Sequence, residues 1–119
     1  MDSYVLMTDL KQLEETLARH RKGFLLFFKH STRCPVSSQA LDEFQRFVQT
    51  NTGKQVPAVV VHVIEHRDVS DAVAEMFGVQ HESPQAILLK EGTLCWHTSH
   101  QNITASNLHQ AVTGDWQKE

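Results

Sequence analysis

The sequence lacks the features that would place this chain in a membrane, on a nucleic acid or outside the cell. No stretch approaches the roughly 18 consecutive apolar residues of a membrane-spanning helix. Acidic and basic residues are interspersed at a formal net charge of −3, without a basic block. The first twenty residues carry several acids instead of a signal-peptide core. We therefore expect a cytoplasmic protein with neither a membrane nor a nucleic-acid partner.

Cysteine is also scarce, with two residues in a chain of 119. In a reducing cytosol the two are expected to be free thiols rather than a disulfide. A chain of this length needs no disulfide or metal, because folding buries roughly two-thirds of its unfolded surface. Since no linker or internal repeat divides the sequence, we expect residues 1–119 to form a single domain.

Apolar residues recur with the periods of alternating strands and helices. The pattern predicts strands over residues 4–7, 24–28, 59–64, 86–89 and 93–98. It predicts helices over residues 9–22, 68–77 and 104–112, and another from 35 to near 51–53. Thr8 and Asp68 are expected to cap two of these helices, and Gly23 to end the first.

The predicted elements follow the order β-α-β-α-β-α-β-β-α. Two successive β-α-β units cross over right-handed and give parallel strands, whereas the closing hairpin adds antiparallel ones. We therefore expect an α/β protein with a mixed central sheet of about five strands and helices on both faces. This architecture resembles the thioredoxin fold, including its additional N-terminal strand and helix.

The main candidate for chemistry is Cys34, which stands between a buried strand and the helix that Pro35 opens. A cysteine at a helix N-terminus meets free N–H groups and the positive end of the helix dipole, which favour the thiolate. Arg33 adds a neighbouring cation, and we expect the hydroxyl of Ser37 to reach back toward the sulfur. The alternative, an inert buried cysteine, is disfavoured by the polar residues 30–33.

Ser37 also occupies the position where a Cys-x-x-Cys motif carries its second cysteine. With Cys34-Pro35-Val36-Ser37 in its place, the sulfur can attack a disulfide, but only an external thiol can release it. The site is therefore expected to be monothiol.

Cys95 is the other thiol of the chain. A hairpin turn at residues 91–92 places it about five strand residues from the end of the sheet that carries Cys34, on the order of 15 Å at ~3.3 Å per residue. A disulfide needs Cα atoms within ~7 Å of each other. We expect Cys95 to be a buried strand thiol rather than a resolving cysteine.

A further feature of the site is Pro84, which comes just before a predicted strand. In the thioredoxin fold this position normally carries a cis proline that faces the active cysteine. By that resemblance we expect a cis Ser83–Pro84 bond, although a trans bond is the general rule for proline. A cis proline turns the backbone of Ser83 toward the site, where an extended substrate pairs with it as an added strand.

Two stretches together resemble the monothiol bacilliredoxins of the bacillithiol system: Lys29–Ser37 (KHSTRCPVS) and Glu82–Gln85 (ESPQ). The resemblance covers nearly the whole chain. It implies a thiol–disulfide oxidoreductase that removes bacillithiol from S-bacillithiolated proteins, with bacillithiol as co-substrate and no bound cofactor. By position, Cys34 is the nucleophile, Ser37 fills the absent resolving position and Pro84 belongs to the substrate-binding loop.

Substrate contacts are expected from residues around the cysteine and across the site: His30, Thr32, Arg33, Pro35, Ser83 and Pro84. The family commonly has threonine where this chain has Arg33, which bears on substrate preference. His30 is expected in a polar loop, where it either raises the local positive potential or faces solvent. Lys29 and the loop 99–101 complete the groups available to bacillithiol, a cysteinyl glucosamine joined to malate.

Three alternatives stay open on the residues alone. The same groups would suit the carboxylates of another low-molecular-weight thiol such as glutathione, in a glutaredoxin-like reaction. A non-enzymatic adaptor would use the fold only as a binding surface, and an iron–sulfur carrier would resemble monothiol glutaredoxins, whose motif is Cys-Gly-Phe-Ser. The eight histidines show no ligand spacing, so no metal is expected. Expected partners are S-bacillithiolated proteins, a low-molecular-weight thiol and a disulfide reductase.

Overall fold

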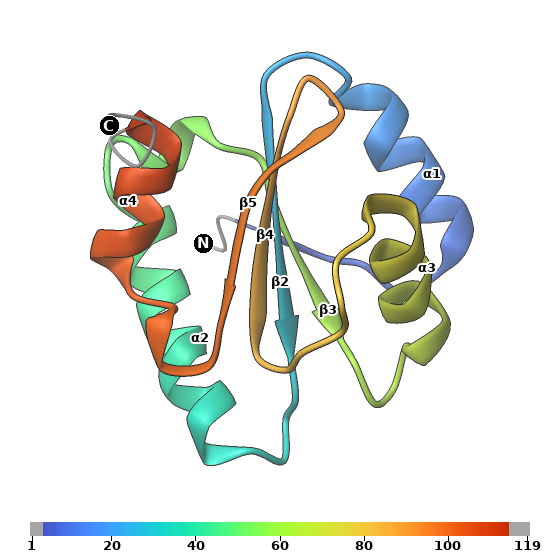
Figure 1. Ribbon diagram of the computed structural model, residues 1–119, viewed down its shortest axis with the longest axis horizontal. Coiled ribbons are helices and arrows are strands. Elements are labelled where there is room, and N and C mark those ends of the chain that lie inside the picture. Colours follow the sequence, from blue (N-terminus) through green and yellow to red (C-terminus); the bar gives the residue numbers. More distant parts are fainter. Residues whose placement is uncertain (1–3, 115–119) are drawn as a thin grey trace.

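A computed structural model describes residues 4–114, so residues 1–3 and 115–119 of the expected domain lie outside the described part. Within that part, a five-stranded mixed sheet lies between two layers of helices (Figure 1). The strands are β1 (Val5–Leu6), β2 (Phe24–His30), β3 (Ala58–His62), β4 (Gln85–Lys90) and β5 (Thr93–Ser99). The helices are α1 (Leu10–Arg19), α2 (Pro35–Val48), α3 (Arg67–Phe77) and α4 (Ala105–Thr113), with 3₁₀ turns at Gly53–Gln55 and His100–Asn102. The predicted α/β class and order of elements are confirmed.

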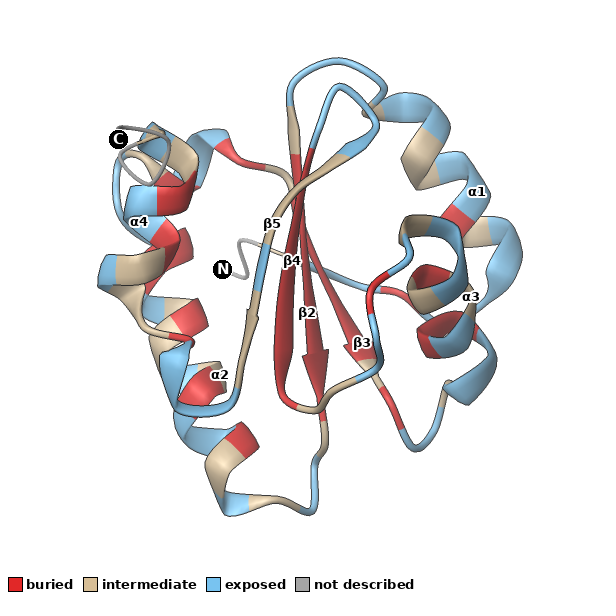
Figure 2. Cartoon of the chain, viewed as in Figure 1, coloured by how far each residue is buried: buried red, intermediate tan, exposed pale blue. Residues whose placement is uncertain are grey.

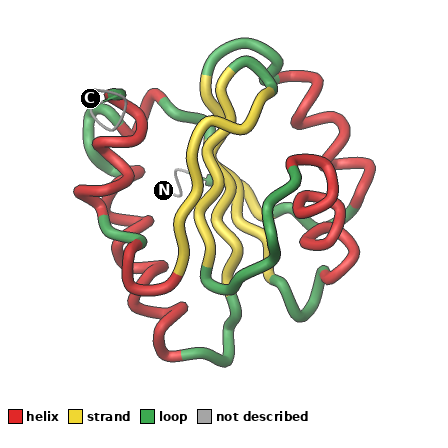
Figure 3. Tube along the Cα trace, in the orientation of Figure 1, coloured by secondary structure: helices red, strands yellow, loops and turns green. Residues whose placement is uncertain are grey.

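The central strand β2 has a partner on each side. It runs parallel to β3 and antiparallel to β4, in the sheet order β1-β3-β2-β4-β5. The register pairs His30 with His62 and Lys29 with Gln85. The segments that follow β2 and β3 and the segment that precedes β4 therefore meet at one edge of the sheet (Figure 3), which we call the site end.

Strand β2 is continuously apolar because its side chains alternate between two buried faces of the sheet. Phe28 packs with residues of α2 and α4, whereas Phe27 packs with residues of α1 and α3, and both are 0% exposed. Helices thus cover both faces of the strand, as the buried central strands in Figure 2 show. The alternation continues to the end of β2, so Lys29 faces the α1/α3 layer and His30 the α2/α4 layer.

The strand is two residues longer than the predicted span of 24–28. Lys29 pairs with both β3 and β4, and His30 pairs with β3, so His30 is not in the polar loop where it was expected. Both side chains are buried, at 0% and 6% exposure. Buried polar groups need hydrogen-bond partners, and here the partners come from distant elements that a sequence pattern does not reveal.

Helix α1 begins and ends slightly differently from the prediction. The carboxylate of Asp9 accepts from the N–H of Gln12 at 2.7 Å, so Asp9 caps the helix in place of Thr8. The N–H of Thr8 donates instead to the side chain of Gln12. The helix ends at Arg19 with His20 as its C-cap, and Gly23 takes a positive φ of 82° in the turn that leads back to the sheet.

The caps of the later helices differ less from the prediction. His66 takes the cap position of α3, and Asp68 lies in the first turn, where its carboxylate accepts from the N–H of Val69 at 2.8 Å. An acid in this turn still complements the helix dipole. Thr104 caps α4 by accepting from the N–H of Asn107. Across residues 4–114, no helix combines the length and apolar character needed to span a bilayer.

Leu13 and Leu10 offer a matched pair within α1. Leu13 is 0% exposed in the core beneath the helix, whereas Leu10 is 45% exposed. We expect Leu13→Ala to lower the free energy of unfolding by about 2–5 kcal/mol, because it leaves a cavity. Leu10→Ala should change it by at most about 0.5 kcal/mol. Urea unfolding followed by circular dichroism measures both, and equal losses would contradict the packing of α1.

Candidate active site

Cys34 is the N-cap residue of α2, at the point where the loop after β2 becomes helical. Its N–H donates to the carbonyl of Ser31 at 3.3 Å, and its carbonyl accepts from the N–H of Ser38 at 3.0 Å. Pro35 is the first helical residue, as predicted. The side chain of Cys34 is half-buried and makes no capping hydrogen bond. The sulfur therefore lies at the positive end of the helix dipole and is not engaged as a cap.

The hydroxyl of Ser37 bonds the start of the loop rather than the sulfur, which corrects our expectation. Its oxygen lies 2.7 Å from Nδ1 of His30 and accepts from the N–H of Ser31 at 2.9 Å. Ser37 is 0% exposed, so these contacts are shielded from water. Ser37 thus has a structural task at the position where a resolving cysteine would stand.

His30 is part of this internal network and is not a surface group. Its ring stacks on Phe28 at a centroid distance of 5.9 Å and meets the ring of His62 edge-on at 5.6 Å. Burial lowers the pKa of His30, the neighbouring His62 lowers it further, and Glu65 opposes them. The imidazole is therefore neutral at neutral pH and adds no positive charge to the site. Being 6% exposed, it offers little surface to a substrate.

The Ser83–Pro84 peptide bond is cis, as expected from the resemblance. Because Lys29 pairs with Gln85, Pro84 lies at the site end, level with the end of β2. The carbonyl of Pro84 accepts from the N–H of His100 at 3.0 Å. The 99–101 loop therefore reaches the site end, as predicted. Ser83 is half-buried, and its hydroxyl has no hydrogen-bond partner among the described residues.

The outer surface of the site comes from the loop residues. Thr32, Arg33 and Pro35 are all exposed beside Cys34. Thr32 Oγ1 donates to the carboxylate of Glu65 at 3.4 Å, which adds an acidic group that our sequence analysis missed. The sequence did contain a signal for Glu65. This residue follows the strand predicted to run parallel to β2, and parallel neighbouring strands end at the same edge of the sheet.

Lys29 was expected near the cysteine as a group for substrate carboxylates, but it is buried on the opposite face of the sheet from α2. Its Nζ donates to the carbonyl of Ser70 at 2.9 Å and lies 3.3 Å from Nδ1 of His81. Burial lowers the pKa of Lys29 to about 8, while Asp71 opposes the shift. The ammonium group therefore belongs to the interior, not to the surface around Cys34.

Cys95 lies at a β-bulge in β5, where the register shifts between Leu88 and Leu89. It is half-buried rather than fully buried, and burial raises the pKa of its thiol. Ser99 of the same strand marks the site end, so about four residues, or ~13 Å at ~3.3 Å per residue, separate Cys95 from that edge. Cys95 and Cys34 are both free thiols.

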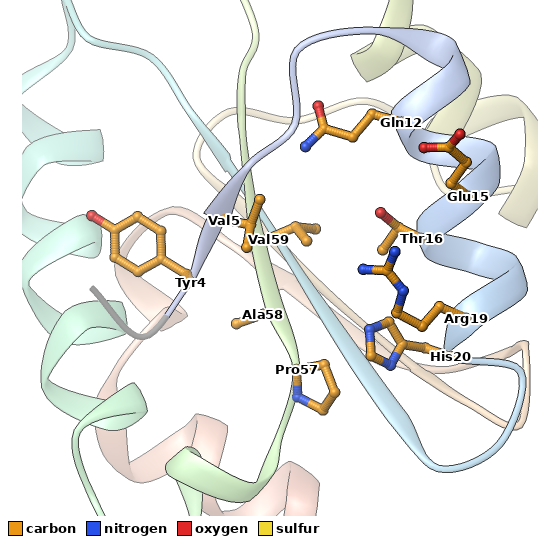
Figure 4. A pocket seen from close by; sticks show the side chains of 10 residues that line it. All are labelled: Tyr4, Val5, Gln12, Glu15, Thr16, Arg19, His20, Pro57, Ala58 and Val59. Atoms are coloured by element: carbon orange, nitrogen blue, oxygen red, sulfur yellow. The ribbon is translucent and has the colours of Figure 1, made fainter. Parts of the chain in front are cut away.

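A metal site is not formed among the described residues, and a hollow beside α1 lies away from Cys34. Within residues 4–114, no group of three or more His, Cys, Asp or Glu side chains is arranged to hold a metal ion. A hollow of about 520 Å³ lies between α1 and the β1 edge of the sheet, with Tyr4, Arg19 and Pro57 in its lining (Figure 4). Pro57 precedes β3 at the end of the sheet opposite the site end, so this hollow is remote from Cys34.

A cysteine at the start of α2, with a cis proline at the same edge of the sheet, is the arrangement of thioredoxin-fold oxidoreductases. A solved structure described as a proposed oxidoreductase with a thioredoxin fold is 30% identical, with a TM-score of 0.81 over 92% of this chain and 93% of its own. Thioredoxins from Malassezia sympodialis and Nicotiana alata are each 17% identical, with TM-scores of 0.74 and 0.75. They cover 96% and 95% of this chain, and 91% and 92% of their own, and show the fold alone.

The family model of the monothiol bacilliredoxin BrxC matches residues 6–108. The matched range includes Cys34, Ser37 and the Ser83–Pro84 bond. The chain therefore belongs to the monothiol bacilliredoxin family, and thiol redox chemistry on a thioredoxin fold is its general function.

Two neighbouring serines of α2 test the buried network. Ser37→Ala removes the acceptor of the Ser31 N–H and the partner of His30, so we expect a loss of about 1–3 kcal/mol in the free energy of unfolding. Ser38 is exposed, and Ser38→Ala should change this free energy by at most about 0.5 kcal/mol. Denaturant unfolding measures both; a Ser37→Ala protein as stable as its control would show that the network contributes nothing.

The buried histidine also predicts how stability depends on pH. Because the pKa of His30 is lowered by burial and by His62, the unfolded chain binds the proton more readily than the folded one. The free energy of unfolding should therefore fall as the pH drops below about 6.5. His30→Gln should reduce this fall, whereas His109→Gln, at an exposed position of α4, should not. An undiminished fall in His30→Gln would exclude His30 as its source.

Proposed function

We propose that this protein is a monothiol oxidoreductase that removes bacillithiol from S-bacillithiolated proteins through Cys34. The observation that carries the proposal is the position of Cys34 at the N-cap of α2, with Ser37 where a resolving cysteine would stand. Membership of the monothiol bacilliredoxin family supports bacillithiol as the thiol.

The reaction takes two displacement steps. In the first, the Cys34 thiolate attacks the bacillithiol sulfur of the mixed disulfide. A new S–S bond forms to Cys34, the old S–S bond breaks, and the substrate protein leaves as a thiolate that takes a proton from water. In the second, a free bacillithiol thiolate attacks the bacillithiol sulfur bound to Cys34, which releases bacillithiol disulfide and restores the enzyme.

The electrons for the overall reduction come from the second bacillithiol molecule. A disulfide reductase then returns bacillithiol disulfide to the thiol. The positive end of α2 assists both steps, because it stabilises the Cys34 thiolate as nucleophile and as leaving group. Cys95 does not replace the external thiol, because the ~13 Å of strand between it and the site end exceeds the ~7 Å between Cα atoms that a disulfide requires.

The surface around Cys34 offers one cation and several neutral donors to the substrate. Arg33 suits the malyl carboxylates, Thr32 suits sugar hydroxyls, and the backbone of Ser83 suits an extended substrate chain. These groups also fit the carboxylates of glutathione, so the preference for bacillithiol rests on the family. Such chemistry depends on a pool of reduced thiol, which supports a cytoplasmic location.

The test uses one protein loaded with bacillithiol or, separately, with glutathione. We expect the wild type to release bacillithiol faster than glutathione when each free thiol is supplied. Cys34→Ser should release neither, because it lacks the nucleophile, and Cys95→Ser should act like the wild type. Mass spectrometry of the loaded protein follows the loss of each thiol with time.

Each other outcome has a distinct meaning. An inactive but folded Cys95→Ser protein would overturn the monothiol mechanism. Equal or faster release of glutathione would assign a glutaredoxin-like reaction with another low-molecular-weight thiol. An unreactive Cys34 would point to a non-enzymatic adaptor, and a visible absorbance band in the purified protein would point to an iron–sulfur carrier.

A further inference from the structure

The last two residues of β2 are a buried lysine and a buried histidine, which need a physical reason. Lys29 and His30 are 0% and 6% exposed and face opposite sides of the sheet. Burying polar side chains at the end of a central strand costs desolvation that apolar residues would avoid. Each of the two makes its side-chain hydrogen bonds with a different segment of the site end.

We propose that these two side chains position separate halves of the active site. His30 holds the loop of Cys34, which orients the nucleophile. Lys29 holds segment 79–83, which leads to Pro84 and sets the surface where the substrate chain docks. The inference rests on the proposed function, in that both halves serve thiol exchange at Cys34.

The first half is linked through Ser37. The ring of His30 is fixed by its stacking on Phe28, and its Nδ1 lies 2.7 Å from the hydroxyl oxygen of Ser37. The same oxygen accepts from the N–H of Ser31. Cys34 lies midway between these two serines, so the loop that carries it is held at both ends. The rigid strand thereby sets the position of the sulfur.

The second half is linked through His81. A lysine ammonium has three donors and no acceptor, and Lys29 is mostly protonated at neutral pH because its pKa is about 8. Nδ1 of His81, 3.3 Å away, must therefore accept, and the ring proton lies on Nε2. The hydroxyl of Ser70 lies 3.3 Å from the same nitrogen. Lys29 also donates to the carbonyl of Ser70, which connects the segment to α3.

A cross-strand neighbour supports this second half. Gln85 is paired directly with Lys29, and its Nε2 donates to the carbonyl of Gln80 at 3.0 Å. Two consecutive residues of segment 79–83 are thus held by two side chains that sit opposite each other in the ladder. The path to Pro84 is therefore set from the α1/α3 face.

Lys29→Met tests the second half, because methionine keeps the length of the side chain and removes its donors. Replacing a buried charge by an apolar group need not destabilise the fold. We expect KM for the bacillithiol-loaded protein to rise about tenfold with kcat little changed. Alkylation of Cys34 by iodoacetamide should keep its wild-type rate. Lys90→Met, the same change at an exposed position of β4, is the matched control and should alter neither.

Ser37→Ala tests the first half, with Ser38→Ala as its control. We expect alkylation of Cys34 to slow by about threefold or more, because a loosened loop weakens the influence of the helix N-terminus on the thiolate. kcat should fall by a similar factor, with KM little changed.

Should Lys29→Met fail to fold, His81→Ala removes the same Lys29–His81 link from an exposed position.

Amide hydrogen exchange needs no thiol substrate, so it separates this inference from the proposed function. We expect faster exchange over residues 79–83 in Lys29→Met and His81→Ala, and over residues 31–38 in Ser37→Ala, with the other segment unchanged. Slower alkylation of Cys34 in folded Lys29→Met, or loosening of both segments by one substitution, would overturn the inference. A wild type that releases no bacillithiol while showing this exchange pattern would overturn the proposed function alone.

Discussion

The register of β2 between β3 and β4 is the constraint on which the site depends. A parallel partner on one side and an antiparallel partner on the other bring two strand ends and one strand start to the same edge. Cys34 follows one of the strands that end there, and Pro84 precedes the strand that starts there. Backbone hydrogen bonding alone therefore brings together residues that are far apart in sequence, and the side-chain contacts of the site add to this arrangement.

The same strand is apolar on both faces until its last two residues. Up to Phe28 each face is covered by helices, and the packing there needs no hydrogen bonds. At Lys29 and His30 the helices and the loops of the site end supply polar partners in place of water. The boundary between the core and the candidate active site thus lies within a single strand, where the side chains stay buried but change from apolar to polar.

The two thiols of the chain lie in different surroundings. Cys34 lies at the positive end of a fourteen-residue helix. Cys95 lies at a bulge nearer the hairpin turn, where burial raises the pKa of its thiol. About four strand residues, or ~13 Å at ~3.3 Å per residue, separate Cys95 from the end of the sheet that carries Cys34, whereas a disulfide needs Cα atoms within ~7 Å. This separation supports the proposal that the second thiol comes from outside the chain.

Local patterns were enough to predict the order of elements, the burial of β2 and the position of Cys34 at a helix start, because these depend on neighbours in the chain. The absence of a second cysteine at Ser37 was equally plain. Only the tertiary structure decided that the hydroxyl of Ser37 bonds His30 rather than the sulfur and that the Lys29 side chain lies in the interior. A period-two pattern states which face a side chain occupies, but its partner depends on which distant element packs against that face.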